Sequence, residues 1–235
     1  MAFPLPLQVC EVRRQTPTVS SLRMRPVDGH AREPFLAGQV AILEIEGGGS
    51  SYMAFAGAPE DEDYEFLIKR TAGTDFTEAL FRGEETGEFP TVLLRRIVGT
   101  GFPVVGDPGQ DVVLVAMGTG LAPLRSTLRH LLTERSAHGR VIVLYGARSV
   151  DDFCYQQEMT TEWLHQGVEL RQVISRPDER EWSGATGYVQ SLLDNLVPTL
   201  RQPLALVCGS LEMIEQTRSR LLTLGFPADR IRTNF

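Results

Sequence analysis

The first part of the chain consists of short apolar or alternating runs that are separated by Gly, Pro and Asp. Runs of this kind cover residues 7–15, 19–27, 38–46, 64–70 and 91–99. Strands this short, with turns this frequent, are typical of an antiparallel barrel or sandwich. One stretch differs: "TDFTEALF" predicts one or two helical turns with Thr74 or Asp75 as the N-cap.

The pattern changes after residue 111. The stretch "VVLVAM" (112–117) reads as a fully apolar strand, and the next has apolar residues at 124, 128, 131 and 132, the spacing of one helix face. Further strand-like runs at 141–147, 168–175 and 204–209 alternate with helix-like runs at 151–164, 188–196 and 211–225. This alternation predicts βαβ units and a parallel sheet. We therefore expect two domains, residues 1–106 and residues 107–235.

Composition and charge narrow the class of protein. The chain has 235 residues, enough for two small domains, and a formal net charge of -7. An acidic chain argues against nucleic acid and anionic membranes as partners, because both bind clustered Lys and Arg. No run approaches the roughly 20 apolar residues of a membrane span, and the N-terminus lacks the pattern of a signal peptide. We expect a cytoplasmic protein, or a plastid stromal one if a transit peptide has been removed.

The three cysteines, Cys10, Cys154 and Cys208, are far apart in the sequence. Neither they nor the four histidines show the spacing of a zinc or iron–sulfur site, so we expect no metal and three reduced thiols. Cys208 ends an apolar run, where a cysteine is most simply a small buried hydrophobic residue. Its position would nevertheless put it beside any ring bound at the end of that strand.

Four predicted parallel strands end in glycine or small polar residues: "GTG" at 118–120, "GARS" at 146–149, "SRPDE" at 175–179 and "CGS" at 208–210. Ligands of such sheets bind beyond the carboxyl ends of the strands, so these ends predict one continuous binding rim. The "GTG" turn precedes a helix, whose N–H groups and dipole suit a pyrophosphate. The alternative is an ordinary tight turn, because Pro123 stands where the usual G-x-G-x-x-G fingerprint has its third glycine.

Two arginines extend this rim. Arg148 with Ser149, and Arg176 with Ser175, are suited to contact an adenosine ribose or its 2′-phosphate. The alternative for the first pair is a surface arginine followed by a Ser or Asp helix cap. The alternative for Arg176 is a solvated side chain.

The order and spacing of these motifs resemble the ferredoxin–NADP reductase superfamily over nearly the whole chain. The resemblance rests on GQ at 38–39, followed by "EFLIKR", "FTEAL", "GTGFPV", "GTGLAPLRS", "LYGARS", "ISRPD", "GATGYVQ", "CGSLEM" and a terminal aromatic residue. The stretches "WSGATGYVQ" and "DRIRTNF" look closest to a reductase-like branch that includes plant chloroplast fruit-protein homologues. The resemblance implies an N-terminal flavin-binding β-barrel and a C-terminal NAD(P)-binding α/β domain, with hydride transfer in the cleft between them.

The resemblance also implies site residues by position. Thr119, Cys208 and Phe235 are expected at the reacting rings, with Phe235 as the terminal aromatic residue that covers the flavin. The expected nucleotide contacts are Gly118, Thr119, Gly120, Gly146, Arg148, Ser149, Ser175, Arg176 and Gly209. The expected flavin contacts are Tyr52, Met53, Ala54, Phe55, Lys69, Phe76 and Thr77.

The segment "SYMAFAGAP" (51–59) departs from the family pattern R-x-Y-S-x-x-S-x-P. Ser51 stands where the family has the arginine for the flavin pyrophosphate, and Ala54 where it has the serine near flavin N5. Losing an arginine–phosphate contact costs about 1.5–3 kcal/mol, which a tightly held flavin would survive. We expect the backbone N–H groups of residues 52–55 and the Met53 side chain to hold the ring, with altered chemistry near N5.

Together these features predict a flavoprotein electron-transfer enzyme. It would be a flavin-dependent NAD(P)H oxidoreductase that passes electrons to a separate protein or small-molecule acceptor, because the chain has no iron–sulfur segment. The expected flavin is FAD, with FMN as the alternative. NADH and NADPH both stay open as donors, because the two arginines suit a 2′-phosphate while "GARS" followed by two Asp resembles NADH-using relatives. The alternative function is a flavin-free, nucleotide-binding regulatory or structural subunit with the same fold.

Overall fold

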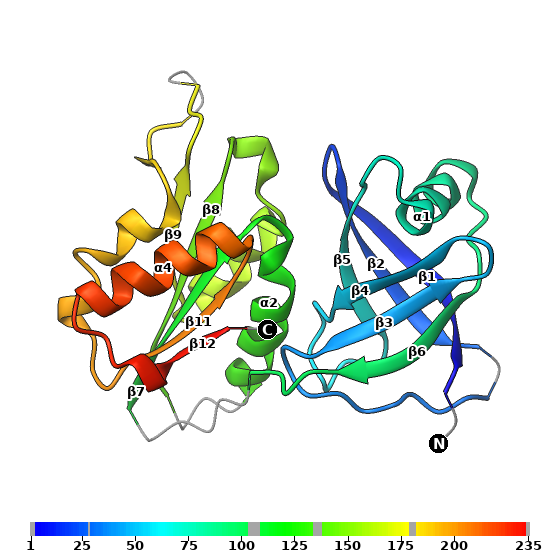
Figure 1. The fold of residues 1–235 in the computed structure, drawn as a ribbon, viewed down its shortest axis with the longest axis horizontal. Coiled ribbons are helices and arrows are strands. Elements are labelled where there is room, and N and C mark those ends of the chain that lie inside the picture. Colours follow the sequence, from blue (N-terminus) through cyan, green and yellow to red (C-terminus); the bar gives the residue numbers. More distant parts are fainter. Residues whose placement is uncertain (1–2, 28, 103–108, 134–137, 179–181, 234–235) are drawn as a thin grey trace.

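The computed structural model describes residues 3–27, 29–102, 109–133, 138–178 and 182–233. Two lobes lie side by side, a β-barrel lobe and an α/β lobe (Figure 1). The predicted boundary between residues 106 and 107 falls outside the described residues and stays a prediction. In the part of the chain that is described, no helix has the length and apolar content needed to cross a membrane.

The barrel lobe is built on one six-stranded antiparallel sheet. Its strands are β1 (Leu5–Thr16), β2 (Val19–Pro26), β3 (Val40–Ile45), β4 (Gly49–Ala54), β5 (Tyr64–Lys69) and β6 (Val92–Val98), in the order β4-β3-β6-β1-β2-β5. An isolated antiparallel bridge between Phe55 and Phe66 joins the end of β4 to β5, so the two edges of the sheet meet. The sequence left barrel and sandwich open, and this bridge decides for the barrel.

Helix α1 (Asp75–Thr86) lies at one end of the barrel (Figure 1). It is longer than the one or two turns predicted, because Phe76, Leu80 and Phe81 bury an apolar face in the barrel core. Thr74 is the N-cap residue, but its side chain makes no capping hydrogen bond. The prediction of the N-cap position was therefore right, and the expected side-chain cap is absent.

The α/β lobe is a six-stranded parallel sheet with helices on both faces. Its strands are β7 (Gln110–Met117), β8 (His138–Ala147), β9 (Glu169–Ile174), β10 (Ala185–Thr186), β11 (Leu204–Cys208) and β12 (Ile231–Thr233), in the order β10-β9-β8-β7-β11-β12. Helix α2 (Leu121–Thr133) packs with residues 112, 114 and 116 of β7, and α4 (Leu211–Thr223) packs with residues 113 and 115. The run 112–116 is apolar throughout because both of its faces are covered. The predicted parallel α/β lobe is confirmed.

Two predicted helices are shorter than the apolar pattern indicated. Residues 151–164 form the 3₁₀ turn η2 (Val150–Asp152), the short helix α3 (Gln156–Glu158) and the π-helical segment η3 (Met159–Trp163). Tyr155, with a φ of 55°, precedes α3, and this left-handed conformation interrupts any longer helix. Residues 188–196 form only the 3₁₀ helix η4 (Val189–Leu193), and another 3₁₀ turn, η5 (Val197–Thr199), follows it. A last 3₁₀ turn, η6 (Ala228–Arg230), leads into β12.

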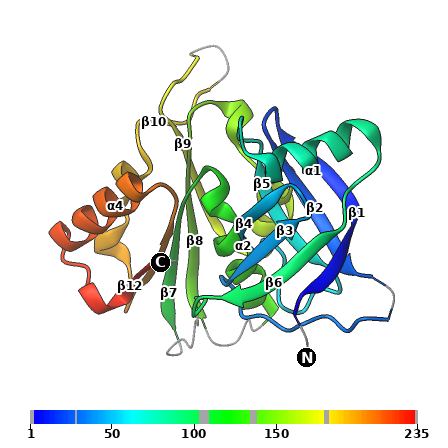
Figure 2. The same ribbon diagram turned by 45° about the vertical axis from the view of Figure 1, so that its right-hand side comes forward.

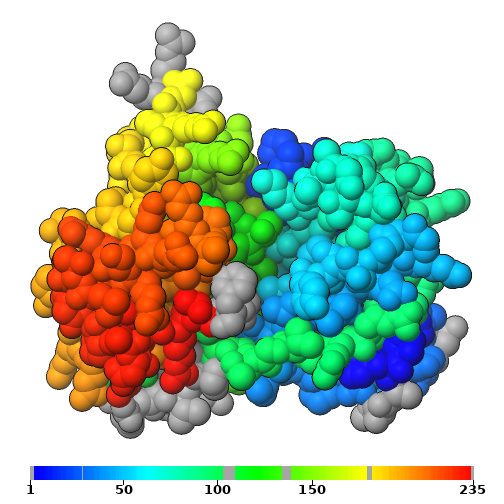
Figure 3. Space-filling model, viewed as in Figure 1, coloured from blue at the N-terminus to red at the C-terminus, as the bar shows by residue number. Residues whose placement is uncertain are grey.

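Helix α2 lies on the side of the parallel sheet that faces the barrel (Figures 1 and 2). Val19, Ala56, Leu67 and Phe102 of the barrel lobe belong to the same buried cluster as the inner residues of α2. The two lobes therefore share part of their apolar core. In the space-filling view a notch separates the lobes beside this junction, with the green segment that includes α2 between them (Figure 3).

Candidate functional site

The turn between β7 and α2 is closely packed against its neighbours. Gly118–Gly120 form the 3₁₀ turn η1, and Gly118 has a φ of 55°, a conformation that favours glycine. A Cβ on Gly120 would lie 2.5 Å from the carbonyl oxygen of Cys208, so the turn touches the backbone at the end of β11. The Tyr145 hydroxyl donates a hydrogen bond to the Gly118 carbonyl oxygen at 3.1 Å. Thr119, between the two glycines, is half-buried.

The order of the parallel sheet brings the predicted strand ends to one edge. β9, β8, β7 and β11 are parallel neighbours, so residues 175–176, 146–149, 118–120 and 208–209 follow one another along this rim. The first turn of α2 has no acidic side chain, which leaves its N-terminal N–H groups favourable for an anion. The structure therefore brings the predicted nucleotide contacts together.

The polar side chains of this rim differ in what they can offer a ligand. The Arg176 N–H donates to the Arg148 carbonyl oxygen at 2.8 Å, which aligns two exposed arginines at neighbouring strand ends. The Ser149 hydroxyl donates to Asp152 at 2.9 Å, and the two residues form a capping box on η2. This contact matches the helix-cap alternative for Ser149, so the hydroxyl is engaged within the protein. Ser175 is half-buried beside Arg176.

The remaining glycines of the rim are also close to neighbouring atoms. A Cβ on Gly146 would lie 3.0 Å from the Val189 side chain, and one on Gly209 would clash with the end of the Met213 side chain and lie 3.3 Å from Met117. Glycine at both positions therefore lets these protein side chains pack closely against the ends of β8 and β11.

Cys208 ends β11 beside the glycine turn and is buried, with 8 % of its surface exposed. Burial raises the pKa of its thiol to about 12, so the thiol stays protonated at neutral pH. A protonated thiol is a poor nucleophile. Cys208 can therefore contribute to the site only by lying beside the glycine turn. Phe235, the third residue expected at the reacting rings, lies outside the described residues.

The four residues expected to hold the flavin ring differ in accessibility. Tyr52 is 71 % exposed, whereas Met53 is half-buried against the barrel core, because alternate strand residues point to opposite faces. Ala54 is half-buried against the core that the lobes share. Phe55 is fully buried among the aromatic rings of the barrel and donates its N–H to the Gln39 carbonyl oxygen at 3.2 Å. Phe55 therefore has neither its ring nor its N–H free for a ligand.

Phe76 and Thr77 are buried at the start of α1, where the resemblance implied contact with the flavin phosphate. Phe76 packs into the barrel core, and the Thr77 hydroxyl accepts an N–H of the preceding loop at 3.2 Å. Both side chains are occupied within the protein. Lys69 is exposed at the end of β5, and Arg70 beside it pairs with Glu78 at 3.1 Å.

The two cofactors that the family implies fit this chain unequally. A nicotinamide nucleotide fits the rim, because the glycine turn and the start of α2 offer backbone N–H groups without acidic neighbours. A flavin ring fits along β4, the end strand of the barrel sheet, where Tyr52 is exposed and Met53 and Ala54 are half-buried. The flavin phosphate fits less well, because the first turn of α1 carries Asp75 and Glu78, and Ser51 offers no positive charge. Within the described residues, no group of three or more His, Cys, Asp or Glu side chains is placed to hold a metal ion.

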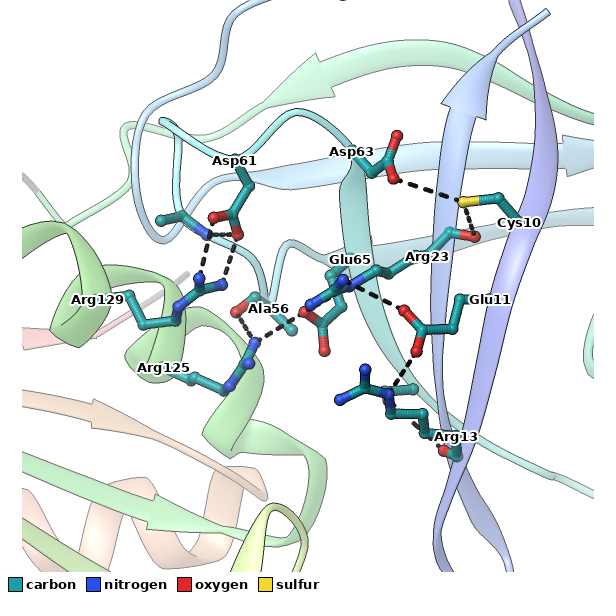
Figure 4. Close-up of polar contacts among 12 residues, drawn as sticks. Cys10, Glu11, Arg13, Arg23, Ala56, Asp61, Asp63, Glu65, Arg125 and Arg129 are labelled. Atoms are coloured by element: carbon teal, nitrogen blue, oxygen red, sulfur yellow. Dashed lines mark hydrogen bonds and ion pairs between the residues drawn. The ribbon is translucent and has the colours of Figure 1, made fainter. Parts of the chain in front are cut away.

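The polar junction between the lobes was not predicted from the sequence. Arg125 of α2 has a side chain that is only 5 % exposed, and it donates to the Ala56 carbonyl oxygen at 2.7 Å. Arg129 pairs with Asp61 of the barrel lobe at 2.9 Å (Figure 4). The one signal in the sequence is the spacing of the two arginines, since residues four apart share a helix face.

The chain shows similarity to known proteins along its whole length. A profile of the family described as "Oxidoreductase NAD-binding domain" matches residues 114–219, from β7 into α4. Ferredoxin–NADP reductase B of Sorangium cellulosum is 31 % identical over 232 residues, covering 92 % of this chain and 91 % of that protein. The fruit protein pKIWI502 of Actinidia deliciosa is 30 % identical over 175 residues, covering 72 % of this chain and 53 % of that protein.

Solved structures show the same fold. The structure described as "Ferredoxin reductase in carbazole 1,9a-dioxygenase" has a TM-score of 0.83 and 25 % sequence identity, covering 98 % of this chain and 68 % of that chain. The chain spans 67 % or 66 % of the length of several other curated relatives, so it matches only part of those proteins.

The barrel, the parallel sheet and the glycine-rich rim define an NAD-binding oxidoreductase of two lobes. The chain belongs to the ferredoxin–NADP reductase family and is a reductase by this membership. The resemblance drawn from its motifs, including that to the fruit-protein branch, is confirmed.

Proposed function

We propose that this protein is a flavin-dependent NAD(P)H oxidoreductase that transfers a hydride from nicotinamide to flavin and passes the electrons to a separate acceptor. The observation that carries this proposal is the contact of the glycine turn with β11, where Gly120 leaves no room for a Cβ beside Cys208. A turn held this tightly at the start of a helix supports binding of a dinucleotide pyrophosphate.

The residues of the chain would bind and orient the two rings. The N–H groups at the start of α2 would hold the pyrophosphate, and Arg148 and Arg176 would contact the adenosine half. Thr119 and Cys208 would border the nicotinamide, while the backbone and side chains of 52–54 would lie along the flavin. When bound, the flavin supplies the ability to accept two electrons and release them singly or in pairs.

The electron acceptor is proposed to be a separate protein or small molecule. The Sorangium cellulosum relative is named as a ferredoxin reductase, which supports a small electron-transfer protein as one acceptor. A reducing compartment such as the cytoplasm suits the three free cysteines, Cys10, Cys154 and Cys208.

A visible absorption spectrum of the purified protein, with and without added FAD or FMN, tests the proposal. Anaerobic addition of NADH and then NADPH should bleach the flavin band, and the nucleotide that bleaches it faster is the donor. A protein that stays colourless and binds neither flavin would contradict the reductase proposal.

A flavin-free, nucleotide-binding subunit is the second candidate. Two features favour this second function: the first turn of α1 is acidic, and position 51 carries serine in place of an arginine. Both weaken a binding site for the flavin phosphate. Calorimetric titration separates the two functions, since this subunit would bind NADH or NADPH while failing to bind FAD or FMN.

A further inference from the structure

A buried cluster of charged side chains joins the two lobes around Arg125, and Figure 4 shows its contacts with Ala56 and Glu65. The Arg125 guanidinium donates from Nη1 to the Ala56 carbonyl oxygen at 2.7 Å and lies 3.2 Å from Glu65 of β5. On its other side it donates from Nη2 to Glu158 at 2.7 Å. One side chain of the α/β lobe thus bonds a barrel backbone group and two carboxylates, one in each lobe.

Tyr155 completes the cluster from the α/β lobe. Its hydroxyl donates to Glu65 at 2.9 Å, and the Arg125 guanidinium lies over its ring, 4.0 Å from the centroid. Its N–H donates to Gln15 of β1 at 2.8 Å. Tyr155 is also the residue with a φ of 55°, a conformation that costs a non-glycine residue free energy. Contacts to both lobes hold it in that conformation.

The charges of the cluster are matched to one another. Burial raises the pKa of Glu65, but the Arg125 guanidinium and the Tyr155 hydroxyl outweigh burial, so the pKa lies below its ordinary value. Glu65 and Arg125 are therefore both charged at neutral pH. Arg23 of β2 lies 3.7 Å from Glu65 within the barrel lobe, whereas Arg125, at 3.2 Å, is the closer arginine and comes from the other lobe. A buried carboxylate that lost this closer arginine would be strongly unfavourable, so the two lobes are held at the separation that keeps Arg125 and Glu65 in contact.

The cluster connects the two halves of the candidate site. Arg125 is five residues after Gly120 on the helix that begins at the glycine turn, and Ala56 is two residues after Ala54 of the flavin segment. We propose that Arg125 is a positioning residue that locks the nucleotide turn in register with the 52–54 segment, and so sets how the two rings meet. The effect on how the two rings meet rests on the proposed function, whereas the role of Arg125 in holding the turn in register with residues 52–54 does not.

The first test uses the protein without added cofactor. Trp163 and Trp182 are the two tryptophans of the chain and both belong to the α/β lobe, so their fluorescence reports that lobe, while far-UV circular dichroism reports both lobes. In urea the two signals should give coincident transitions for the wild type. Arg125→Lys keeps the charge but loses the planar fork, so its two transitions should separate.

Two further variants make this test specific. Tyr155→Phe keeps the ring and removes only the hydroxyl bond to Glu65, so it should separate the two transitions less than Arg125→Lys does. It also replaces Arg125→Lys as the test variant if that protein does not fold. Arg140→Lys is the matched control, because Arg140 bonds Glu169 in the same forked way within the α/β lobe alone. Its transitions should stay coincident.

The second test measures flavin reduction in stopped flow with FAD-loaded protein and NADH or NADPH. Arg125→Lys should lower the limiting rate constant about tenfold or more, while the nucleotide Kd changes little, because misalignment affects the reaction more than binding. The positioning role of Arg125 would be overturned if the fluorescence and circular dichroism transitions of Arg125→Lys coincided, or if those of Arg140→Lys separated equally. Failure of the wild-type protein to bind flavin would overturn the proposed function, and the urea test alone would then decide whether Arg125 holds the two lobes in register.

Discussion

Replacement of Gly120 by alanine tests the contact on which the nucleotide site depends. The added Cβ would lie 2.5 Å from the carbonyl oxygen of Cys208, 2.7 Å from its carbonyl carbon and 2.8 Å from the Cα of Gly209. All three are backbone atoms, so no side-chain rotation relieves the clash. Carbon and oxygen atoms approach no closer than about 3.3 Å even in favourable contacts, so the turn and β11 must separate by roughly 1 Å.

The expected effects follow from this displacement. Overpacking costs about 1–3 kcal/mol, and each kcal/mol lowers the Tm of a protein of this size by about 2–4 °C. Hydrogen bonds from backbone N–H groups to a charged phosphate contribute about 1.5–3 kcal/mol, so losing one should weaken nucleotide binding about ten- to hundredfold. Isothermal titration calorimetry with NADH and NADPH measures the Kd, and thermal unfolding measures the Tm.

Two glycine variants serve as controls for Gly120→Ala. Gly118→Ala meets no atom within 4 Å but must adopt a φ of 55°, which costs about 1–2 kcal/mol without a clash. Gly167→Ala has the same kind of strain, with a φ of 82°, far from the rim at the start of β9. Gly167→Ala should lose stability and keep its nucleotide affinity. Unchanged affinity in Gly120→Ala, with a Tm loss no larger than that of Gly167→Ala, would refute the reasoning.

Three other predictions concern thiols, pH and charge. Partial burial and the Asp63 carboxylate raise the pKa of the Cys10 thiol, but Cys10 is exposed, whereas Cys154 and Cys208 are buried and their thiol pKa values are raised to about 11 and about 12. A maleimide at neutral pH should therefore label one thiol in the native protein and three in urea. Burial raises the pKa of Glu65, but its arginine partner and a tyrosine hydroxyl bring it below the ordinary value. Its stabilising contribution is therefore complete at neutral pH and is lost as the pH falls below about 4, so Glu65→Gln should flatten acid unfolding there. Arg148→Gln should lower kcat/KM for NADPH about tenfold or more while leaving that for NADH little changed, in a steady-state assay with a dye acceptor.

Each of these three predictions has a contrary result. Labelling of two or three thiols in the native protein would contradict the burial of Cys154 and Cys208. Identical acid unfolding of the wild type and Glu65→Gln would show that Glu65 is not held charged by its neighbours. Equal losses with NADH and NADPH for Arg148→Gln would mean that this arginine does not contact a 2′-phosphate.

The periodicity of the sequence predicted both lobes because it is a local property. Alternating runs in the first part of the chain indicated antiparallel strands, and the apolar run at 112–117 indicated a strand covered on both faces. The rim was predictable because parallel strands end at one edge, which brings Gly118 and Gly209 together once the sheet is known.

Side-chain direction was not predictable in the same way. A family resemblance assigns a residue to a position in the chain, but it does not say which way the side chain points. Phe55 and Phe76 were expected at the flavin, and both are buried in the barrel core. Ser149 was expected at the nucleotide, and its hydroxyl caps η2. In each case the side chain packs in the core or makes a local hydrogen bond, so it is not available to contact a ligand.

The sequence by itself determined the two lobes, the chain order of the motifs and the family to which the protein belongs. Only the tertiary structure decided that Gly120 touches Cys208 and that Arg125 bridges Glu65 and Ala56. These contacts join residues far apart in the chain: the first depends on how β7 and β11 pair within the α/β lobe, and the second depends on how the two lobes pack. Local pattern specifies which face of an element is buried, whereas the partner of a buried charge is set by whatever distant group the fold brings within hydrogen-bonding distance.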